Sequence, residues 1–281
     1  MRYFLVSDIH GNLEALQAVM EDMNRNYKPS FSKKGKDRLG NLGDIIGYIP
    51  NPNEVMDIVF PIASFNLIGN HDMAVSSNEY QSFNRDALWA MEWTLKTLTE
   101  PNRKRLESLF ESERYTYSPD GLIFSHSNPG YPRNMSEYIQ SKDDAFNLFF
   151  GHGGFARKIA FAGHIHAPQI YISNRNLAKV KSTKVMNIIR EKKIDFMDPL
   201  KTPVERVVKS FNLKDAFSSL VVIPSVGQPR DRCPLSGYAV FDTDTKVVDL
   251  VRVPYDIPKT QEKMRRLNFP EHLIHRISIG S

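Results

Sequence analysis

Short apolar runs that end abruptly in polar residues recur along the chain. The first, Arg2 to Val6, leads into Ser-Asp-Ile-His and a glycine, and apolar residues at helical spacing then predict a helix from Leu13 to Met23. Similar runs occupy 64–68, 121–125, 159–162 and 220–223. Apolar runs that alternate with helical segments favour an α/β protein, in which functional side chains follow the carboxyl ends of strands.

The segments between these runs predict further elements. A weakly apolar stretch at 38–42 is a poor strand, and 54–60 follows a good helix start signal. Residues 80–110 are helical in pattern with a break at Glu100-Pro101, and 141–150 forms another helix. The runs 238–242 and 247–253 predict a hairpin, and the last twenty or so residues suit one or two short helices.

Composition narrows the class of protein without naming a function. The 281 residues are 41% hydrophobic and 25% charged, which is typical of a globular protein. The single cysteine, Cys233, excludes an intramolecular disulfide framework, and no apolar run approaches the roughly 20 residues of a spanning helix. The chain begins with a strand pattern rather than a leader, so we expect a cytoplasmic protein without a membrane partner. The net charge of +5 suits an anionic substrate but does not require one.

Side chains with metal-binding chemistry cluster at the ends of the apolar runs. Five of the eight histidines lie there, together with three aspartates and one asparagine: Asp8, His10, Asp44, Asn70, His71, Asp72, His126, His164 and His166. Mixed nitrogen and oxygen ligands without thiolate suit Mn²⁺, Fe or Zn²⁺ better than Ca²⁺ or Mg²⁺. The set is too large for one ion, whereas two ions that share a carboxylate would use it fully. Two such ions form the usual clamp for displacement at phosphorus.

These blocks, in this order, resemble the signature of the calcineurin-like metallophosphoesterase superfamily. The resemblance rests on Asp8-Ile9-His10, Gly43-Asp44, Gly69-Asn70-His71-Asp72, His126 and Gly163-His164-Ile165-His166. The stretches 47–54, 225–231 and 269–273 are similar to a bacterial subgroup of diadenosine-tetraphosphatase-like and protein-phosphatase-like phosphoesterases. The resemblance implies a four-layer α/β/β/α sandwich of two mixed sheets flanked by helices.

The resemblance also implies a role for each matching residue. Asp8, His10 and His166 would bind a first metal, and Asn70, His126 and His164 a second, with Asp44 between them. A hydroxide that bridges the metals would attack phosphorus. His71 would assist the leaving oxygen or stabilise the transition state, and Asp72 would orient its ring. Manganese is the metal we expect, with Fe, Zn and Ni as alternatives.

Two features lie outside the signature. Arg230 could bind a substrate phosphate bidentately, or it could be a loop residue that pairs with Asp231. The stretch 175–210 is rich in Lys and Arg and predicts a basic insertion within one domain that spans 1–281. It lacks the interleaved aromatic residues of RNA-binding segments, so we expect no nucleic-acid partner.

The sequence therefore predicts a dinuclear, metal-dependent phosphoesterase that hydrolyses phosphomonoesters or phosphodiesters. A protein Ser/Thr phosphatase and a hydrolase of dinucleoside polyphosphates or cyclic nucleotides are the alternatives among enzymes. The alternative from another class is a non-catalytic scaffold of the same fold, but scaffold members usually lose ligands, and here every ligand is present. The motifs leave the physiological substrate and the oligomeric state open.

Overall fold

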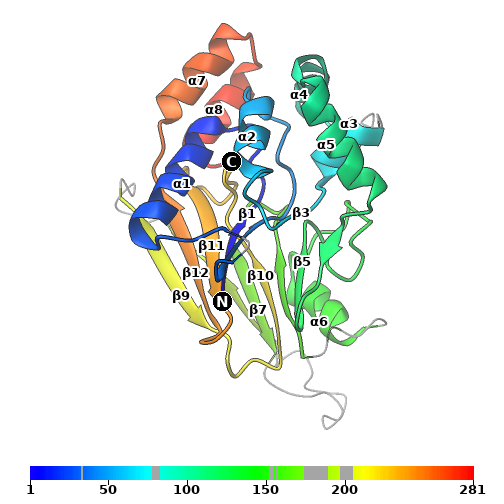
Figure 1. Cartoon of the computed structure of the whole chain (residues 1–281), viewed down its shortest axis with the longest axis vertical. Helices are drawn as coiled ribbons and strands as arrows, with labels where there is room; N and C mark the ends of the chain where they lie inside the picture. Colours follow the sequence, from blue (N-terminus) through cyan, green and yellow to red (C-terminus); the bar gives the residue numbers. More distant parts are fainter. Residues whose placement is uncertain (33, 78–82, 152–154, 156, 174–188, 197–204) are drawn as a thin grey trace.

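Two mixed six-stranded sheets form the centre of the molecule in the computed structural model (Figure 1). The structure describes residues 1–281 except 33, 78–82, 152–154, 156, 174–188 and 197–204. The first sheet has the strand order β3 (Phe65–Asn66), β2 (Asp37–Asn41), β1 (Arg2–Val6), β11 (Ser236–Asp242), β12 (Val247–Val253), β9 (Val207–Asn212). The second has the order β4 (Thr116–Tyr117), β5 (Leu122–Ser125), β6 (Ile159–Ala162), β10 (Ser218–Val222), β7 (Gln169–Ser173), β8 (Ile189–Lys193).

Eight helices accompany the sheets in the described part of the chain. Their bounds are α1 (Leu13–Asn26), α2 (Pro52–Val59), α3 (Asn70–Ser77), α4 (Arg85–Thr97), α5 (Glu100–Glu111), α6 (Lys142–Phe150), α7 (Ile257–Arg266) and α8 (Glu271–Ile279). None of these helices combines the length and the apolar composition needed to cross a membrane.

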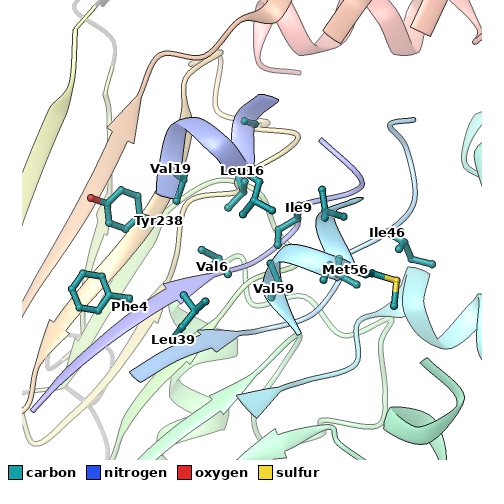
Figure 2. Packing of buried hydrophobic residues seen from close by; sticks show 14 of the residues in the cluster. Phe4, Val6, Ile9, Leu16, Val19, Leu39, Ile46, Met56, Val59 and Tyr238 are labelled. Atoms are coloured by element: carbon teal, nitrogen blue, oxygen red, sulfur yellow. The ribbon is translucent and has the colours of Figure 1, made fainter. Parts of the chain in front are cut away.

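The alternation of side chains along β1 divides the core in two. Phe4 and Val6 belong to a cluster that includes Leu16 and Val19 of α1 and Val59 of α2 (Figure 2). Successive side chains of a strand point to opposite faces of its sheet, so the residues that alternate with Phe4 and Val6 pack on the other face. Tyr3 and Leu5 accordingly join a second cluster, which contains inward-facing residues of the second sheet: Phe124, Phe161 and Val221.

The second sheet is covered on its other face by α6. Ile123, Ala160 and Leu220 pack there against Leu148 and Phe149. The layers are therefore helices, first sheet, second sheet and helix, which confirms the predicted four-layer sandwich.

Parallel pairing brings the strand ends that carry the polar residues to one edge of each sheet. β1 pairs in parallel with β2, and β2 with β3; in the second sheet β6 pairs in parallel with both β5 and β10. Parallel neighbours present their carboxyl ends at the same edge of a sheet, which is where α/β proteins place their sites. Each sheet thus delivers three loops to one edge.

The predicted elements differ from the observed ones mainly in length and in the basic region. The poor strand at 38–42 is β2, whereas the apolar run at 64–68 forms only the two residues of β3. Within the predicted insertion, 189–193 is β8 at the edge of the second sheet, and β9 begins at Val207. Residues 174–188 and 197–204 lie outside the described residues, so the insertion and the single-domain organisation stay predictions.

The last two helices pack over the loop that follows β2. Tyr48 and Ile49 of that loop share an apolar cluster with Phe269, Leu273 and other residues of α4, α7 and α8. Trp89 and Trp93 of α4 meet the Phe269 ring edge-on at 4.7 and 4.9 Å between centroids. This packing fixes α8 close to the polar edge of the sheets.

A buried ion pair holds the loop that follows β10. Arg252 of β12 is fully buried; its Nη2 lies 2.6 Å from Asp231 Oδ2, and its Nη1 donates to the Leu235 carbonyl at 2.8 Å. Asp231 is thus engaged by Arg252 and not by Arg230, one of the two expectations for that arginine. A buried charge that loses its partner is strongly destabilising, so this contact constrains the whole loop.

We expect Arg252→Met to lower the free energy of unfolding by about 3–5 kcal/mol, because Asp231 would keep a charge with no partner. Urea unfolding monitored by circular dichroism measures this loss. The double variant Arg252→Met/Asp231→Asn should recover part of the stability.

Arg266→Met is the matched control for this prediction. Arg266 pairs with Glu262, but the two side chains are 74% and 59% exposed, so the loss should stay near or below about 1 kcal/mol. Equal losses for Arg266→Met and Arg252→Met would contradict the prediction.

Candidate metal centre

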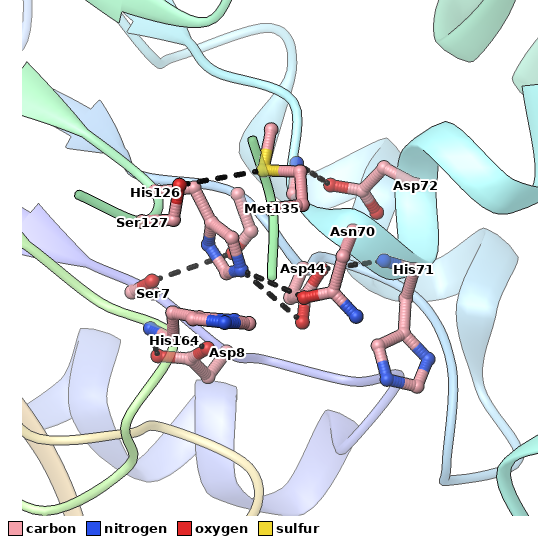
Figure 3. Close-up of polar contacts among 12 residues, drawn as sticks. Ser7, Asp8, Asp44, Asn70, His71, Asp72, His126, Ser127, Met135 and His164 are labelled. Carbon is pink, nitrogen blue, oxygen red and sulfur yellow. Dashed lines mark hydrogen bonds and ion pairs between the residues drawn. The ribbon is translucent and has the colours of Figure 1, made fainter. Parts of the chain in front are cut away.

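The loops from both sheets bring the predicted ligands into two groups that share one residue. Each group holds nitrogen and oxygen atoms that all lie within 4.8 Å of one another, and both contain Asp44. The first group is Asp8, His10, Asp44 and His166; the second is Asp44, His126 and His164. Figure 3 shows Asp44 near Asp8, His126 and His164. Asn70 joins the second group, since its Oδ1 lies 3.2 Å from His126 Nε2. The seven candidate ligands therefore meet at one place, four from loops of the first sheet and three from loops of the second.

Five of these seven residues have a left-handed backbone. The φ angles are positive at Asp8 (54°), His10 (50°), Asp44 (53°), His164 (68°) and His166 (60°). This conformation costs a residue other than glycine roughly 1–2 kcal/mol, and such strain clusters at functional sites. This backbone conformation turns both side chains of each Asp-x-His or His-x-His pair into the site.

Contacts between the loops hold this backbone in place. The amide of Asp8 donates to the Gly43 carbonyl and that of His10 to the Asp44 carbonyl, both at 3.0 Å. The amide of His164 donates to Asp8 Oδ1 at 3.1 Å, which ties the second sheet to the first. A Cβ atom at Gly163 would lie 2.0 Å from Ser7 Oγ, so only glycine lets these loops approach so closely.

Backbone carbonyls fix the orientation of three histidine rings. The Nδ1 atoms of His10 and His126 lie 3.1 Å from the carbonyl oxygens of Ile46 and Leu42, and His166 Nδ1 lies 2.5 Å from that of Gln228. A carbonyl oxygen can only accept, so Nδ1 carries a proton in each ring. In the neutral tautomer the lone pair is then on Nε2, which is the arrangement of metal-binding histidines.

The Nε2 atoms face other acceptors at short distance. His10 Nε2 and His166 Nε2 are 3.2 Å apart, and His126 Nε2 lies 3.4 Å from Asp44 Oδ2. His164 Nε2 is buried and has no hydrogen-bond partner among the residues that the structure describes. Facing lone pairs repel each other unless a proton or a cation lies between them. The donor set therefore fits divalent cations, with imidazole, carboxylate and amide ligands and no thiolate.

Burial keeps the ring neutral at all but one of the histidines in the site. Burial lowers the pKa of His10 and His166, and lowers that of His164 to about 3. Burial acts in the same direction on His126, but the charge of Asp44 and its hydrogen bond outweigh burial and raise the pKa to about 9. In the protein without metal, a proton on His126 thus occupies part of the space that a cation would take.

His71 and Asp72 lie beside the donor groups and belong to neither. The His71 ring is packed among rings, at 4.8 Å from His10, 4.6 Å from Tyr48 and 5.0 Å from Phe83, and its amide donates to Asp44 Oδ1 at 2.9 Å. Burial lowers the pKa of His71 to about 4.

Asp72 does not contact the His71 ring, contrary to its expected role as orienter. Its carboxylate accepts from the amides of Ile45 (3.1 Å), Ile46 (3.3 Å) and Gly69 (3.0 Å), because it lies at the first turn of α3 under the loop that carries Asp44. His71 Nδ1 lies instead 3.1 Å from Met91 Sδ. Asp72 therefore positions the Asp44 loop.

A cavity of about 350 Å³ opens onto the two donor groups. Its lining includes Asp44, His71, His164, His166 and Arg230. Tyr48, Phe83 and Tyr138 also line it, and the Tyr138 ring stacks on His164 at 4.2 Å between centroids. Sequence reasoning did not find Tyr138, since no motif surrounds it and only the folded loop after β5 brings it to His164. Asn84 lines the cavity as well and caps α4, where its side chain accepts from the amides of Asp86 and Ala87.

Comparisons with known proteins agree with this geometry. Residues 1–168 match the family model described as calcineurin-like phosphoesterase. The chain belongs to the calcineurin-like phosphoesterase family. An uncharacterised protein of Methanocaldococcus jannaschii is 34% identical to this phosphoesterase over 280 residues, which is 98% of this chain and 97% of that protein.

Two solved structures are similar over the whole length of the phosphoesterase. A metallophosphoesterase from Sphaerobacter thermophilus has a TM-score of 0.74 and 28% identity, with 100% of this chain and 99% of that chain covered. A hypothetical protein from Pyrococcus horikoshii has a TM-score of 0.71 and 14% identity, with 100% and 98% covered, and shows the same fold. This phosphoesterase is thus a metal-dependent phosphoester hydrolase.

We expect metal binding at pH 7.5 to release about one proton per protein. His126, with a pKa of about 9, carries a proton at that pH, and a cation requires its Nε2 lone pair; the other histidines of the two donor groups are already neutral. Titration calorimetry with Mn²⁺ in two buffers of different ionisation enthalpy counts the protons.

Metal binding should release no proton above about pH 10, where His126 is already neutral. His272→Ala, which removes an exposed histidine that pairs with Asp86 outside the site, is the control and should release the same number of protons as the parent chain. Binding without proton release at pH 7.5 would show that the ion does not displace the proton of His126, which would contradict the prediction.

Proposed function

We propose that the protein is a dinuclear phosphoesterase that hydrolyses phosphomonoesters or phosphodiesters. The observation that carries this proposal is the position of Asp44, whose carboxylate belongs to both donor groups. Asp8, His10 and His166 would hold the first ion, Asn70, His126 and His164 would hold the second, and Asp44 would be shared by both. When bound, the two cations supply the positive charge that activates a water molecule and neutralises the phosphate oxygens. The mixed ligand set favours Mn²⁺, with Fe, Zn and Ni as alternatives.

In this proposal His71 acts on the substrate and not on the metal. Its ring lines the cavity beside Asp44 but belongs to neither donor group. Packing against Tyr48 and Phe83 holds the ring in one orientation. A hydrogen bond from this ring to the leaving oxygen, or to the charge that develops on the phosphoryl group, stabilises the transition state.

Arg230 is proposed to bind a non-bridging oxygen of the phosphate. Asp231 is engaged by Arg252, so the Arg230 guanidinium keeps its charge for the cavity that it lines. Its Nη2 donates to Gln228 Oε1 at 2.9 Å, and its Nε is buried with no hydrogen-bond partner in the described parts of the chain. A guanidinium with free donors is suited to bind phosphate bidentately.

We expect His71→Ala to lower kcat by about 10²-fold or more and to keep both ions, because the ring belongs to neither donor group. Asp44→Asn should lower the metal content and kcat together, since it weakens the ligand that both ions share. Elemental analysis of the purified variants and the rate with an aryl phosphate are the measurements. If both variants lost metal equally, His71 would be a ligand and the division of roles would fail.

The reaction class is tested with a panel of substrates on manganese-loaded protein. The panel contains an aryl monoester, a bis-aryl diester, cyclic nucleotides, diadenosine tetraphosphate and a phosphopeptide. We expect hydrolysis of the monoester or the diester, its loss after chelation and its return with Mn²⁺. Hydrolysis of the phosphopeptide or the dinucleotide alone would select one of the alternative enzyme classes, and no hydrolysis at all would overturn the proposal.

A further inference from the structure

A second arginine lies close to Arg230 at the edge of the candidate site. Arg276 projects from α8, and its guanidinium carbon lies 5.6 Å from the centroid of the Tyr48 ring. The guanidinium carbon of Arg230 lies 5.7 Å from the same ring. Tyr48 in turn contacts His10 and His71, at 4.9 and 4.6 Å between centroids. One tyrosine thus links two arginines with the candidate metal centre.

Neither arginine forms an ion pair with a side-chain carboxylate of the described residues. Arg230 donates to Gln228 Oε1, and Arg276 Nε donates to the main-chain oxygen of Ser281 at 2.7 Å. The nearby carboxylates are engaged elsewhere: Asp231 with Arg252, and Asp86 with His272 at 2.8 Å. Both guanidinium groups therefore keep free donors.

The two charges act on each other and on the site. Burial and the charge of Arg230 lower the pKa of Arg276. The same Arg230 charge contributes, after burial, to the lowered pKa of His71 and of His166. A positive field therefore extends from the candidate metal centre through Arg230 to Arg276.

The two guanidinium groups lie against one tyrosine ring, and their charges repel each other. The Ser281 oxygen and the charge of Asp86 offset only part of the Arg276 charge, and metal ions would add positive charge to the same region. A second anionic group would relieve this repulsion. Apolar packing of Tyr48 with Phe269 and Leu273 holds α8, and with it Arg276, beside the site. The arrangement is therefore fixed by the fold and is ready for a second anionic group.

We propose that Arg276, together with Arg230, forms a subsite for a second phosphate group of the substrate. This inference rests on the proposed phosphoesterase function and narrows its substrate class to phosphate esters that carry another phosphate. The first phosphate takes the position beside His71, and the second reaches past Tyr48 toward α8. Bidentate guanidinium–phosphate contacts give such a subsite both affinity and orientation.

Matched substrates test the subsite on the full-length, manganese-loaded protein. Propyl phosphate is compared with propane-1,3-diol bisphosphate and with the diol bisphosphates of two to six carbons, so that the spacing of the two phosphates varies. We expect kcat/KM to be at least tenfold higher for the best bisphosphate than for the monophosphate. Arg276→Gln should reduce this preference to about the twofold expected for two equivalent esters, and Arg276→Lys should keep part of it, because lysine retains the charge without the planar fork.

Arg265→Gln is the matched control, since Arg265 is an exposed arginine of the neighbouring α7 and loses the same charge. It should retain the full preference of the parent chain. An equal bisphosphate preference in the parent, Arg276→Gln and Arg276→Lys proteins would overturn the subsite. So would a proportional loss for both substrates in Arg276→Gln, because that result would place Arg276 in the support of the fold.

Binding without turnover separates this inference from the proposed function. Calorimetry compares pentane-1,5-bisphosphonate with butylphosphonate, in which methylene groups replace the ester oxygens of propane-1,3-diol bisphosphate and propyl phosphate, so that neither can be hydrolysed. A tenfold preference for the bisphosphonate that Arg276→Gln removes supports the subsite even if no ester is cleaved, in which case only the proposed function fails. Equal affinities for the two phosphonates, together with active hydrolysis of the monoester, would overturn the subsite and leave the proposed function intact.

Discussion

The candidate site depends on acceptor atoms that face one another inside the protein. Hydrogen bonds from Nδ1 to main-chain carbonyls turn the Nε2 atoms of three histidines into the site, and the fold brings these atoms against carboxylates and against each other. At His10 and His166, where burial keeps the rings neutral, Nε2 carries a lone pair. Such an arrangement is unfavourable for an empty protein, because buried lone pairs at 3.2 Å repel and burial disfavours protonation. Cations remove the conflict at all positions together, which is why the donor geometry indicates metal so directly.

The rest of the architecture serves to hold this arrangement. Parallel strands of two different sheets contribute the ligands, so the site depends on the packing of one sheet on the other through residues such as Tyr3, Leu5 and Phe161. Left-handed backbone at five ligands stores strain that the fold must balance. The amide of His164 on the Asp8 carboxylate and the Asp72 carboxylate on the amides of the Asp44 loop provide that balance locally.

An ion pair in the core leaves the arginine at the edge of the cavity without a carboxylate partner in the described part of the chain. Arg252 is buried in the first sheet and takes Asp231, the carboxylate next to Arg230 in the chain. Arg230 therefore lines the cavity with free donors, and α8 places Arg276 against the same Tyr48 ring. An ion pair in the core thus leaves Arg230 without a carboxylate partner among the residues that the structure describes, which is the basis for proposing that it binds an anion.

The amino-acid sequence alone was enough to predict the fold class and the set of candidate ligands. Apolar runs that end in Asp, Asn or His are local features; their chemistry predicts an α/β protein with a metal site, and their resemblance to a known family implies the sandwich and the phosphoesterase reaction. The folded chain was needed to show which Nε2 atom faces which acceptor, that Asp72 supports a loop instead of the His71 ring, and that Arg276 lies near Arg230. These contacts join residues that lie on different elements. Their partners are chosen by how the sheets and helices pack, which no local pattern records.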